Sequence, residues 1–211
     1  MEGLFITFEG CEGSGKTTLI KKVSEELSKQ GYTIVMSREP GGSKIAEDIR
    51  NIILDVNNTE MDDITEALLY ASSRRQHLVE KVLPHLEKHE IVLCDRFLDS
   101  SLAYQGYARG IGIEKVYNIN LSATDGMLPD LTIYVDVKPE IGLKRIESNK
   151  REQNRLDLEA LTFHNKVYEG YEIVSKMFKD RIKCINGNQE IDKVLKDCME
   201  IINKFLKDRN F

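Results

Sequence analysis

The chain has 211 residues, of which 31% are charged, and its 30 basic and 35 acidic side chains give a net charge of −5. This length suits one α/β domain with a sizeable core, and the charge balance argues against a general binder of nucleic acid or membrane surfaces. No apolar run is long enough to span a bilayer, and the amino-terminal residues lack the basic region of a signal peptide. The four cysteines are scattered without CxxC spacing, which indicates reduced thiols, so we expect a cytoplasmic protein.

The first predicted element is a short buried strand at residues 4–8, which runs into a glycine-rich turn and then a helix. The turn fits the phosphate-binding pattern GxxxxGK[ST], with Gly10, Gly15, Lys16 and Thr17 at its defining positions. Glycines let backbone N–H groups approach phosphate oxygens, the lysine brings a cation, and the threonine offers a hydroxyl to Mg²⁺. A chance glycine turn ahead of a surface helix is the alternative, but the strand and helix context favours a nucleotide phosphate site.

The phosphate loop leads into a predicted helix over residues 16–30 and a second predicted strand over residues 32–36. This strand ends in the turn REPGG at residues 38–42, at the edge of the sheet where ligands bind in open α/β folds. An exposed ion pair between the first two residues of the turn is the alternative. Because cis proline occurs in tight, ligand-facing turns, we expect a cis bond between Glu39 and Pro40.

Two helical patterns follow this turn. Ser43 is predicted to cap a helix that ends near residue 54, and its inner face would carry four isoleucines, Ile45, Ile49, Ile52 and Ile53. A longer pattern covers residues 62–88, and Pro84 should kink or interrupt it. Taken alone, the adjacent Arg74 and Arg75 inside this pattern would be typical of a solvated face.

A third apolar strand, residues 91–95, ends in Asp95. In a phosphate-loop fold, a carboxylate at this position helps to hold Mg²⁺, and a simple turn cap is the alternative. The side chains that follow are rich in hydrogen-bonding groups and should lie just past the sheet edge: Arg96, Ser100, Ser101, Tyr104, Gln105 and Arg109.

The remaining chain continues the alternation of strands and helices. Helices are predicted at about 114–125, 140–147, 158–178 and 191–206, and strands at 131–137 and 181–186. The charged stretch near residues 148–155 has no apolar anchor, so it is either a solvated loop or a lid that closes over phosphates. We therefore expect an α/β fold in which a five-stranded parallel sheet is flanked by helices on both faces, as one domain over residues 1–211.

This arrangement favours phosphoryl transfer to a small molecule, which needs positioning and cations more than covalent chemistry. A kinase of another nucleoside monophosphate or of a deoxynucleoside is the nearest alternative. A GTP-dependent switch is the alternative from another class of protein, and the chain contains no plausible N-K-x-D segment for reading guanine.

Four segments together resemble bacterial thymidylate kinases: FEGCEGSGKTT at residues 8–18, REPGG at 38–42, DRFLDSSLAYQG at 95–106 and PDLTIYVD at 129–136. The similarity runs along nearly the whole chain. It implies a P-loop nucleoside-monophosphate-kinase fold, transfer of the γ-phosphoryl of ATP to dTMP with Mg²⁺ to give dTDP for dTTP synthesis, and a homodimer. It implies no nucleic-acid or membrane partner.

The resemblance also implies roles for individual residues. Arg74 and Gln105 would read the thymine base, and Tyr70 would stack on it. Ser101 and Tyr104 would line the deoxyribose side. Three arginines, Arg38, Arg50 and Arg96, would hold the dTMP phosphate, with Glu39 and Pro40 beside them. The phosphate loop would hold ATP through Gly10, Cys11, Glu12, Gly13, Ser14, Gly15, Lys16 and Thr17, and Mg²⁺ would lie near Thr17, Asp95 and Glu39.

Members of this family carry a catalytic arginine either in the phosphate loop or in the lid. The loop interior here has no arginine, so the chain resembles the lid-arginine type, with a lid at about residues 148–158. Arg151 is the first candidate and Arg155 the second, and Glu12 would contact the 3′-hydroxyl of dTMP. Lys16 and Arg96 complete the expected catalytic set. Cys11 is either a small neutral residue or an oxidation-sensitive thiol.

Overall fold

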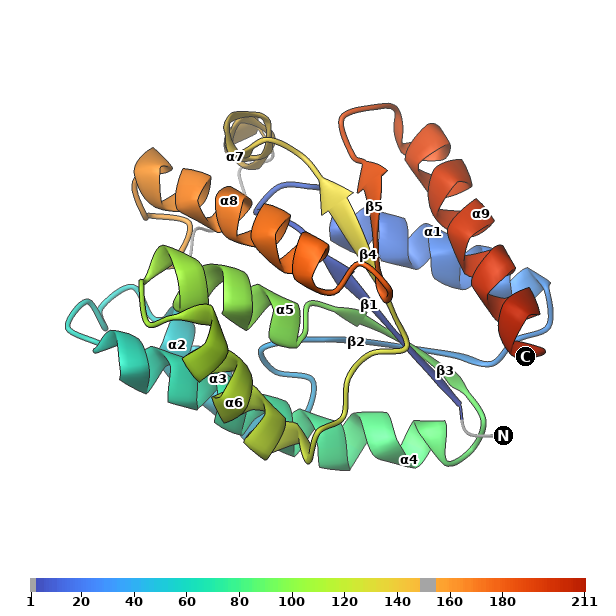
Figure 1. The fold of residues 1–211 in the computed structure, drawn as a ribbon, viewed down its shortest axis with the longest axis horizontal. Helices are drawn as coiled ribbons and strands as arrows, with labels where there is room; N and C mark the ends of the chain where they lie inside the picture. Colours follow the sequence, from blue (N-terminus) through green and yellow to red (C-terminus); the bar gives the residue numbers. More distant parts are fainter. Residues whose placement is uncertain (1–2, 149–154) are drawn as a thin grey trace.

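A computed structural model describes residues 3–148 and 155–211 as a five-stranded, wholly parallel sheet with the order β2-β3-β1-β4-β5 (Figure 1). The strands are β1 (Leu4–Glu9), β2 (Ile34–Arg38), β3 (Ile91–Asp95), β4 (Leu131–Asp136) and β5 (Ile182–Asn186). Because the sheet is parallel, β1, β2 and β3 end at the same edge, and the loops that follow them meet there.

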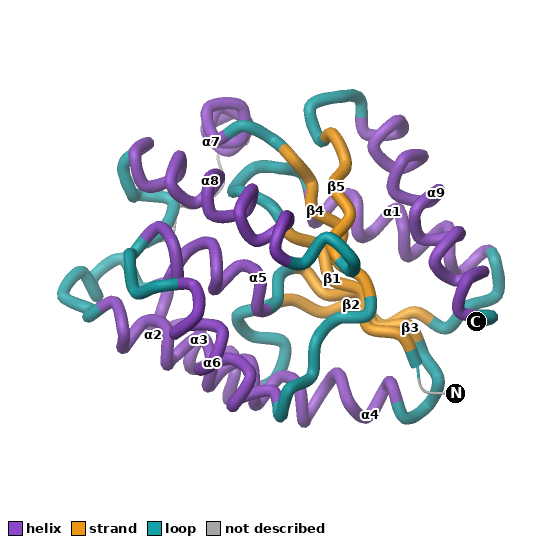
Figure 2. Tube along the Cα trace, in the orientation of Figure 1, coloured by secondary structure: helices purple, strands orange, loops and turns teal. Residues whose placement is uncertain are grey.

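Helices cover both faces of the sheet (Figures 1 and 2). The α-helices are α1 (Lys16–Lys29), α2 (Lys44–Leu54), α3 (Asp63–His77), α4 (Leu83–Leu86), α5 (Leu98–Ser101), α6 (Ile113–Thr124), α7 (Pro139–Ser148), α8 (Leu161–Met177) and α9 (Ile191–Arg209). Two π-helical segments, Leu78–Val82 and Leu102–Ala108, continue α3 and α5. The strand order, the parallel sheet and the two helical layers confirm the predicted fold class.

The core is divided by the sheet into two apolar clusters, as the alternation of strand side chains requires. On one face, Leu4, Ile6 and Phe8 of β1 pack with α1 and α9. On the other face, Phe5 and Val92 pack with residues from α3, the π-helical segments and α8. The central strands are buried on both faces, which explains their nearly continuous apolar sequences.

The second strand begins two residues later than predicted, at Ile34. Tyr32 belongs instead to the turn that ends α1, where its backbone N–H donates to the carbonyl of Leu27 at 3.2 Å. Its ring stacks on Phe211, with the ring centroids 6.0 Å apart. Tyr32 is therefore engaged by the end of α1 and by the carboxyl-terminal residue, outside the strand.

The predicted inner face of α2 was wrong for two of its four isoleucines. Ile53 is fully buried and Ile49 packs against the core, but Ile45 and Ile52 are about half exposed, at 49% and 50%. Ala46 is also fully buried, so the core-facing stripe is centred on Ala46 and Ile53. Ile45 and Ile52 lie seven residues apart on a neighbouring, outward-facing stripe.

The helix ends and the Pro84 interruption follow local chemistry. Ser43 precedes α2 as predicted, but its hydroxyl makes no capping bond, and the Gly42 N–H donates to the carboxylate of Glu47 at 2.7 Å instead. The long predicted helix begins at Asp62, whose carboxylate accepts the N–H groups of the first turn of α3. It changes to a π-helix before Pro84, because proline offers no N–H and crowds the preceding turn.

No helix in the described ranges is both long and apolar enough to cross a membrane.

Candidate active site

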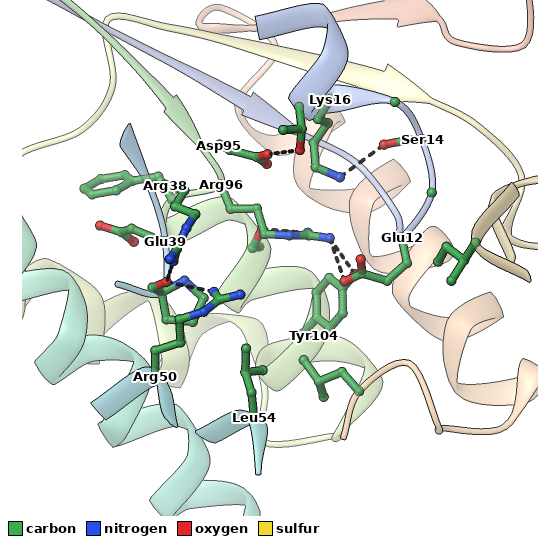
Figure 3. Close-up of a pocket in the computed structure, with 18 of the residues that line it drawn as sticks. Glu12, Ser14, Lys16, Arg38, Glu39, Arg50, Leu54, Asp95, Arg96 and Tyr104 are labelled. Atoms are coloured by element: carbon green, nitrogen blue, oxygen red, sulfur yellow. Dashed lines mark hydrogen bonds and ion pairs between the residues drawn. The ribbon is translucent and has the colours of Figure 1, made fainter. Parts of the chain in front are cut away.

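The phosphate loop wraps around the ammonium group of Lys16. The Lys16 Nζ atom donates to the carbonyl oxygens of Gly10 and Cys11 at 2.9 and 3.0 Å. It also donates to Ser14 Oγ at 3.1 Å (Figure 3). Lys16 is buried, and burial together with the charge of Arg96 lowers its pKa. The loop therefore holds a cation at the amino end of α1, where backbone N–H groups also attract anions.

Glycine is required inside this loop. Gly13 has a φ of +70°, and a Cβ atom there would lie 2.1 Å from the carbonyl oxygen of Gly142 in α7. The reverse contact is equally close, since a Cβ on Gly142 would lie 2.1 Å from the carbonyl oxygen of Glu12. Helix α7 thus packs directly on the backbone of the phosphate loop.

Thr17 and Asp95 form a pair of oxygen ligands beside Lys16. The Thr17 hydroxyl donates to the Asp95 carboxylate at 2.7 Å, which brings together the start of α1 and the end of β3. This donor set suits Mg²⁺, which binds proteins through one or two oxygen groups and completes its shell with substrate phosphates and water. The described residues contain no cluster of three or more His, Cys, Asp or Glu side chains that could hold a metal.

Arg96 is the central cation of the site. Its Nη2 atom donates to Glu12 at 2.8 Å and to Tyr104 Oη at 3.2 Å (Figure 3). Its Nη1 atom donates to Tyr171 Oη at 2.9 Å. The guanidinium also lies over the Tyr104 ring, 5.2 Å from the centroid. The backbone of Arg96 is left-handed, with a φ of +70°, so the turn after β3 is held in an unfavourable conformation for an arginine.

Glu9 holds this turn, and sequence reasoning missed it. The fully buried carboxylate accepts the Phe97 N–H at 2.7 Å, Ser100 Oγ at 2.5 Å and Tyr171 Oη at 2.9 Å. Burial, followed by the charge of Asp99, raises the pKa of Glu9 to about 7. The available signal was an acidic residue at the last position of a strand that is otherwise apolar.

The REPGG turn brings two arginines to one side of the cavity. The Nη1 atoms of Arg38 and Arg50 both donate to the carbonyl oxygen of Pro40, each at 2.9 Å (Figure 3). Burial and the neighbouring charge of Arg38 lower the pKa of Arg50. The bond between Glu39 and Pro40 is cis, which confirms the prediction. This turn therefore concentrates positive charge opposite Arg96, as binding of a phosphate group requires.

Arg74 is buried, with 1% of its surface exposed, so the solvated-face alternative is wrong for Arg74, whereas the Arg75 side chain is 43% exposed. The Nε atom of Arg74 donates to Glu39 at 2.8 Å, and its Nη2 atom donates to the carbonyl oxygen of Phe97 at 3.0 Å. Its Nη1 atom donates to Ser101 at 3.2 Å and also to Asn120. The second N–H of Nη2 has no partner among the residues that the structure describes. A rigidly held guanidinium with one remaining donor suits recognition of a carbonyl oxygen.

Glu39 lies between Arg74 and His77. One carboxylate oxygen accepts Arg74 Nε, and the other is 2.8 Å from His77 Nδ1, whose Nε2 is 2.6 Å from Ser37 Oγ. Both oxygens of Glu39 are therefore engaged by the protein, and its predicted contact with the metal stays a prediction.

These groups line one cavity of about 520 Å³, a volume typical of small-molecule sites. The phosphate loop and Asp95 line one part, and Tyr70, Gln105 and Arg74 line another. Of the predicted residues in the described part of the chain, Gly10, Cys11, Ser101 and Arg155 are absent from the lining. The lining also includes apolar residues that sequence reasoning missed, namely Leu54, Phe97, Ile146 and Leu156.

The predicted lid is only partly described. Arg151 lies outside the described residues. Arg155 donates to the carbonyl of Ile53 at 2.9 Å and pairs with Glu66, and its guanidinium makes no described contact with the phosphate loop. Arg145 of α7 does contact the phosphate loop: its guanidinium donates to the carbonyl oxygen of Gly13 at 3.5 Å and to that of Gly187 at 3.3 Å.

Cys11 is buried, with 3% of its surface exposed, and its carbonyl rather than its thiol contacts Lys16. Burial raises the pKa of the Cys11 thiol to about 12. Since the thiolate is the form that oxidants attack, this geometry favours the small neutral residue over the oxidation-sensitive thiol.

Comparisons with known proteins identify the family of the chain. The family described as thymidylate kinase matches residues 8–198. The thymidylate kinase of Oceanobacillus iheyensis is 57% identical over 99% of this chain and 93% of its own length, and that of Clostridium novyi is 56% identical over 98% and 99%. The crystal structure of thymidylate kinase from Ehrlichia chaffeensis superposes with a TM-score of 0.78 at 31% identity, over 96% of this chain and 100% of that one. The chain therefore belongs to the thymidylate kinase family.

Proposed function

We propose that this protein transfers the γ-phosphoryl group of ATP to dTMP, which gives dTDP and ADP and supplies dTTP synthesis. Family membership supports this assignment, and so does the cavity that joins a phosphate loop to a pocket lined by Arg74, Gln105 and Tyr70. A phosphate oxygen of dTMP attacks the γ-phosphorus in line, and the bond to the ADP oxygen breaks. Because the attacking oxygen is already ionised, the protein need not remove a proton from it.

The cations of the site stabilise the charge that spreads over the transferred group. Lys16 and the loop N–H groups would bind the phosphates of ATP, and Arg38, Arg50 and Arg96 would hold the phosphate of dTMP. Mg²⁺, when bound by Thr17, Asp95 and the phosphates, would neutralise charge and fix the geometry of the ATP phosphates. A role for Glu39 near this metal belongs to the same proposal.

The base and sugar of dTMP would occupy the other part of the cavity. The spare N–H of Arg74 would donate to a thymine carbonyl, Gln105 would pair with the base, and Tyr70 would stack on its ring. Tyr104 and Glu12 would lie against the deoxyribose, since both contact Arg96 at the cavity wall. Ser101 would support the base site indirectly, because it accepts a hydrogen bond from Arg74 and does not line the cavity.

A lid arginine would complete the charge around the transferred group. Arg151 remains our first candidate and Arg155 the second. The pairing of Arg155 with Glu66 favours Arg151, because Arg155 would have to leave a buried carboxylate to reach the phosphate loop.

We also propose a homodimer that forms through α2 and α3, in the cytoplasm. Several apolar side chains of these helices and the loop between them are exposed to at least 40%: Ile45, Ile52, Val56, Ile64 and Leu68. Such a face is self-complementary in a two-fold dimer, in which each copy covers the other. All four cysteines are free, as a reducing compartment requires.

Transfer of a labelled phosphoryl group tests the proposed reaction. With [γ-³²P]ATP, Mg²⁺ and dTMP, the label should appear in dTDP over many turnovers. Label that is released only as inorganic phosphate, whether or not dTMP is present, would show hydrolysis in place of transfer and would contradict the proposal.

A further inference from the structure

Glu66 of α3 is a buried carboxylate that the proposed reaction does not use directly. It is 1% exposed and lies behind the cavity wall, where it contacts Gln105, Arg109 and Arg155. Although burial would raise its pKa, the charge of Arg109 and the hydrogen bonds from Arg155 and Gln105 lower it, so Glu66 is ionised. An ionised carboxylate only accepts hydrogen bonds.

The contact between Glu66 and Gln105 fixes the orientation of an amide. Gln105 Nε2 donates to Glu66 Oε1 at 2.8 Å. The reverse orientation would place the Gln105 carbonyl oxygen against a carboxylate oxygen, with no proton between them. The NH₂ group of Gln105 must therefore face Glu66. This leaves the Gln105 carbonyl oxygen without a donor among the described residues, on a side chain that lines the cavity.

The other oxygen of Glu66 is held by two cations. Oε2 accepts Arg109 Nη2 at 3.3 Å and pairs with Arg155, and Arg109 Nε also donates to Oε1, at 3.4 Å. Arg109 is itself held by Glu159, at 2.6 Å, and its guanidinium lies over the Phe163 ring, 4.4 Å from the centroid. These contacts hold Glu66 from both of its oxygens in the orientation that presents Oε1 to Gln105.

We propose that Glu66 is a positioning residue that directs the carbonyl oxygen of Gln105 towards the base and thereby selects a pyrimidine that carries a proton on N3. Thymine and uracil have that proton, whereas N3 of cytosine is an acceptor and would face another acceptor. The inference rests on the proposed dTMP kinase function, with the base against Gln105, and names the residue that sets one part of its specificity.

Replacing Glu66 by Gln should reverse the Gln105 amide. The two arginines require an acceptor, so the carbonyl oxygen of the new amide would turn to them, because hydrogen bonds from charged donors are the stronger ones. Its NH₂ group would then face Gln105, whose own NH₂ group would turn towards the base. In Glu66→Gln, the ratio of kcat/KM for dTMP to that for dCMP should fall about tenfold or more, as one mismatched buried hydrogen bond costs.

A reciprocal exchange provides the rescue. In the double variant Glu66→Gln, Gln105→Glu, the carboxylate at position 105 accepts the NH₂ group at position 66 and still presents an acceptor to N3–H. This variant should recover most of the dTMP-to-dCMP ratio that Glu66→Gln loses. Glu159→Gln is the matched control, since it removes a carboxylate from the same Arg109 without touching Gln105, and its ratio should stay within about twofold of the unmodified enzyme.

The outcomes separate this inference from the proposed function. Equal loss of kcat/KM on both nucleotides in Glu66→Gln, an unchanged ratio, or a double variant that recovers nothing would overturn the role of Glu66. If Gln105→Ala also leaves the ratio unchanged, the placement of the base against Gln105 is wrong as well. If Glu66→Gln does not fold, the rate at which the side-chain amide protons of Gln105 exchange with solvent in the unmodified enzyme decides the question.

Slow exchange, with and without dTMP, supports the hydrogen bond from these protons to Glu66. Exchange as fast as that of exposed amides refutes it.

Discussion

At the scale of single residues, the site depends on groups that fix the reactive side chains. Arg96 has a left-handed backbone, and Glu9 holds the next N–H, of Phe97, at 2.7 Å. Glu9 also accepts hydrogen bonds from the hydroxyl groups of Ser100 and Tyr171. The oxygens of these two hydroxyl groups in turn accept hydrogen bonds from Arg96. The carboxylate at the end of β1 therefore positions the main cation of the site without touching the cavity.

The ionisation of Glu9 should make stability depend on pH. Its pKa is about 7 in the folded protein, raised first by burial and then by Asp99, against an ordinary value of 4.5. Between these values the folded state binds more protons than the unfolded state, so the contribution of Glu9 to stability falls as pH rises from 4.5 to 7. Arg96 and the bonds from Ser100 and Phe97 act in the opposite direction but are weaker.

Glu9→Gln removes this titration and keeps the size of the side chain. The free energy of unfolding of the unmodified protein minus that of Glu9→Gln should decrease by a few kcal/mol across this pH window, because each pKa unit corresponds to about 1.4 kcal/mol. Urea unfolding at a series of pH values measures the difference. A difference that is constant or increases with pH would refute the assignment.

At the scale of elements, local sequence was enough for some features and not for others. Buried parallel strands are apolar runs, and the phosphate loop is a spacing of particular residues, so both could be predicted. The burial of Arg74 depends on how α6 packs on α3, and the outward face of α2 depends on how α2 packs on α3, which the helical period does not reveal. The partners of Glu9 and Gln105 lie 88 and 39 residues away, so no local pattern indicates them.

The contact between α7 and the phosphate loop leads to a test. In an ordinary helix, Gly→Ala stabilises by up to about 1 kcal/mol. In Gly142→Ala, however, the new Cβ would lie 2.1 Å from the carbonyl oxygen of Glu12, so the loop or the helix must shift. We expect KM for ATP to rise and the melting temperature to fall.

Glu147→Ala in the same helix is the control, since Glu147 is exposed. It should leave both quantities nearly unchanged. An unaltered KM for ATP in Gly142→Ala would show that the loop tolerates the displacement and that the close packing of α7 is unimportant for nucleotide binding.

At the scale of the whole molecule, we propose that the exposed apolar face of α2 and α3 forms the interface of a homodimer. Leu68 is 49% exposed on this face. A charge there would have to be buried without a partner in the dimer, so Leu68→Glu should sediment as a monomer where the unmodified protein sediments as a dimer.

Met177→Glu is the matched control, because Met177 is also an exposed apolar residue, at 55%, but lies at the end of α8. It should remain dimeric. A Met177→Glu monomer together with a Leu68→Glu dimer would place the interface on α8, and a monomeric unmodified protein would contradict the homodimer.

In the proposed function, one cavity binds a thymine nucleotide and phosphorylates it. The most direct measurement is ADP release from ATP and Mg²⁺ with dTMP, dUMP, dCMP, dGMP, AMP and thymidine, each as the only acceptor. We predict strong turnover on dTMP, weaker turnover on dUMP, and almost none on the purine nucleotides. Preference for another monophosphate would contradict the roles of Arg74, Gln105 and Tyr70, and ADP release that needs no acceptor would contradict the kinase function itself.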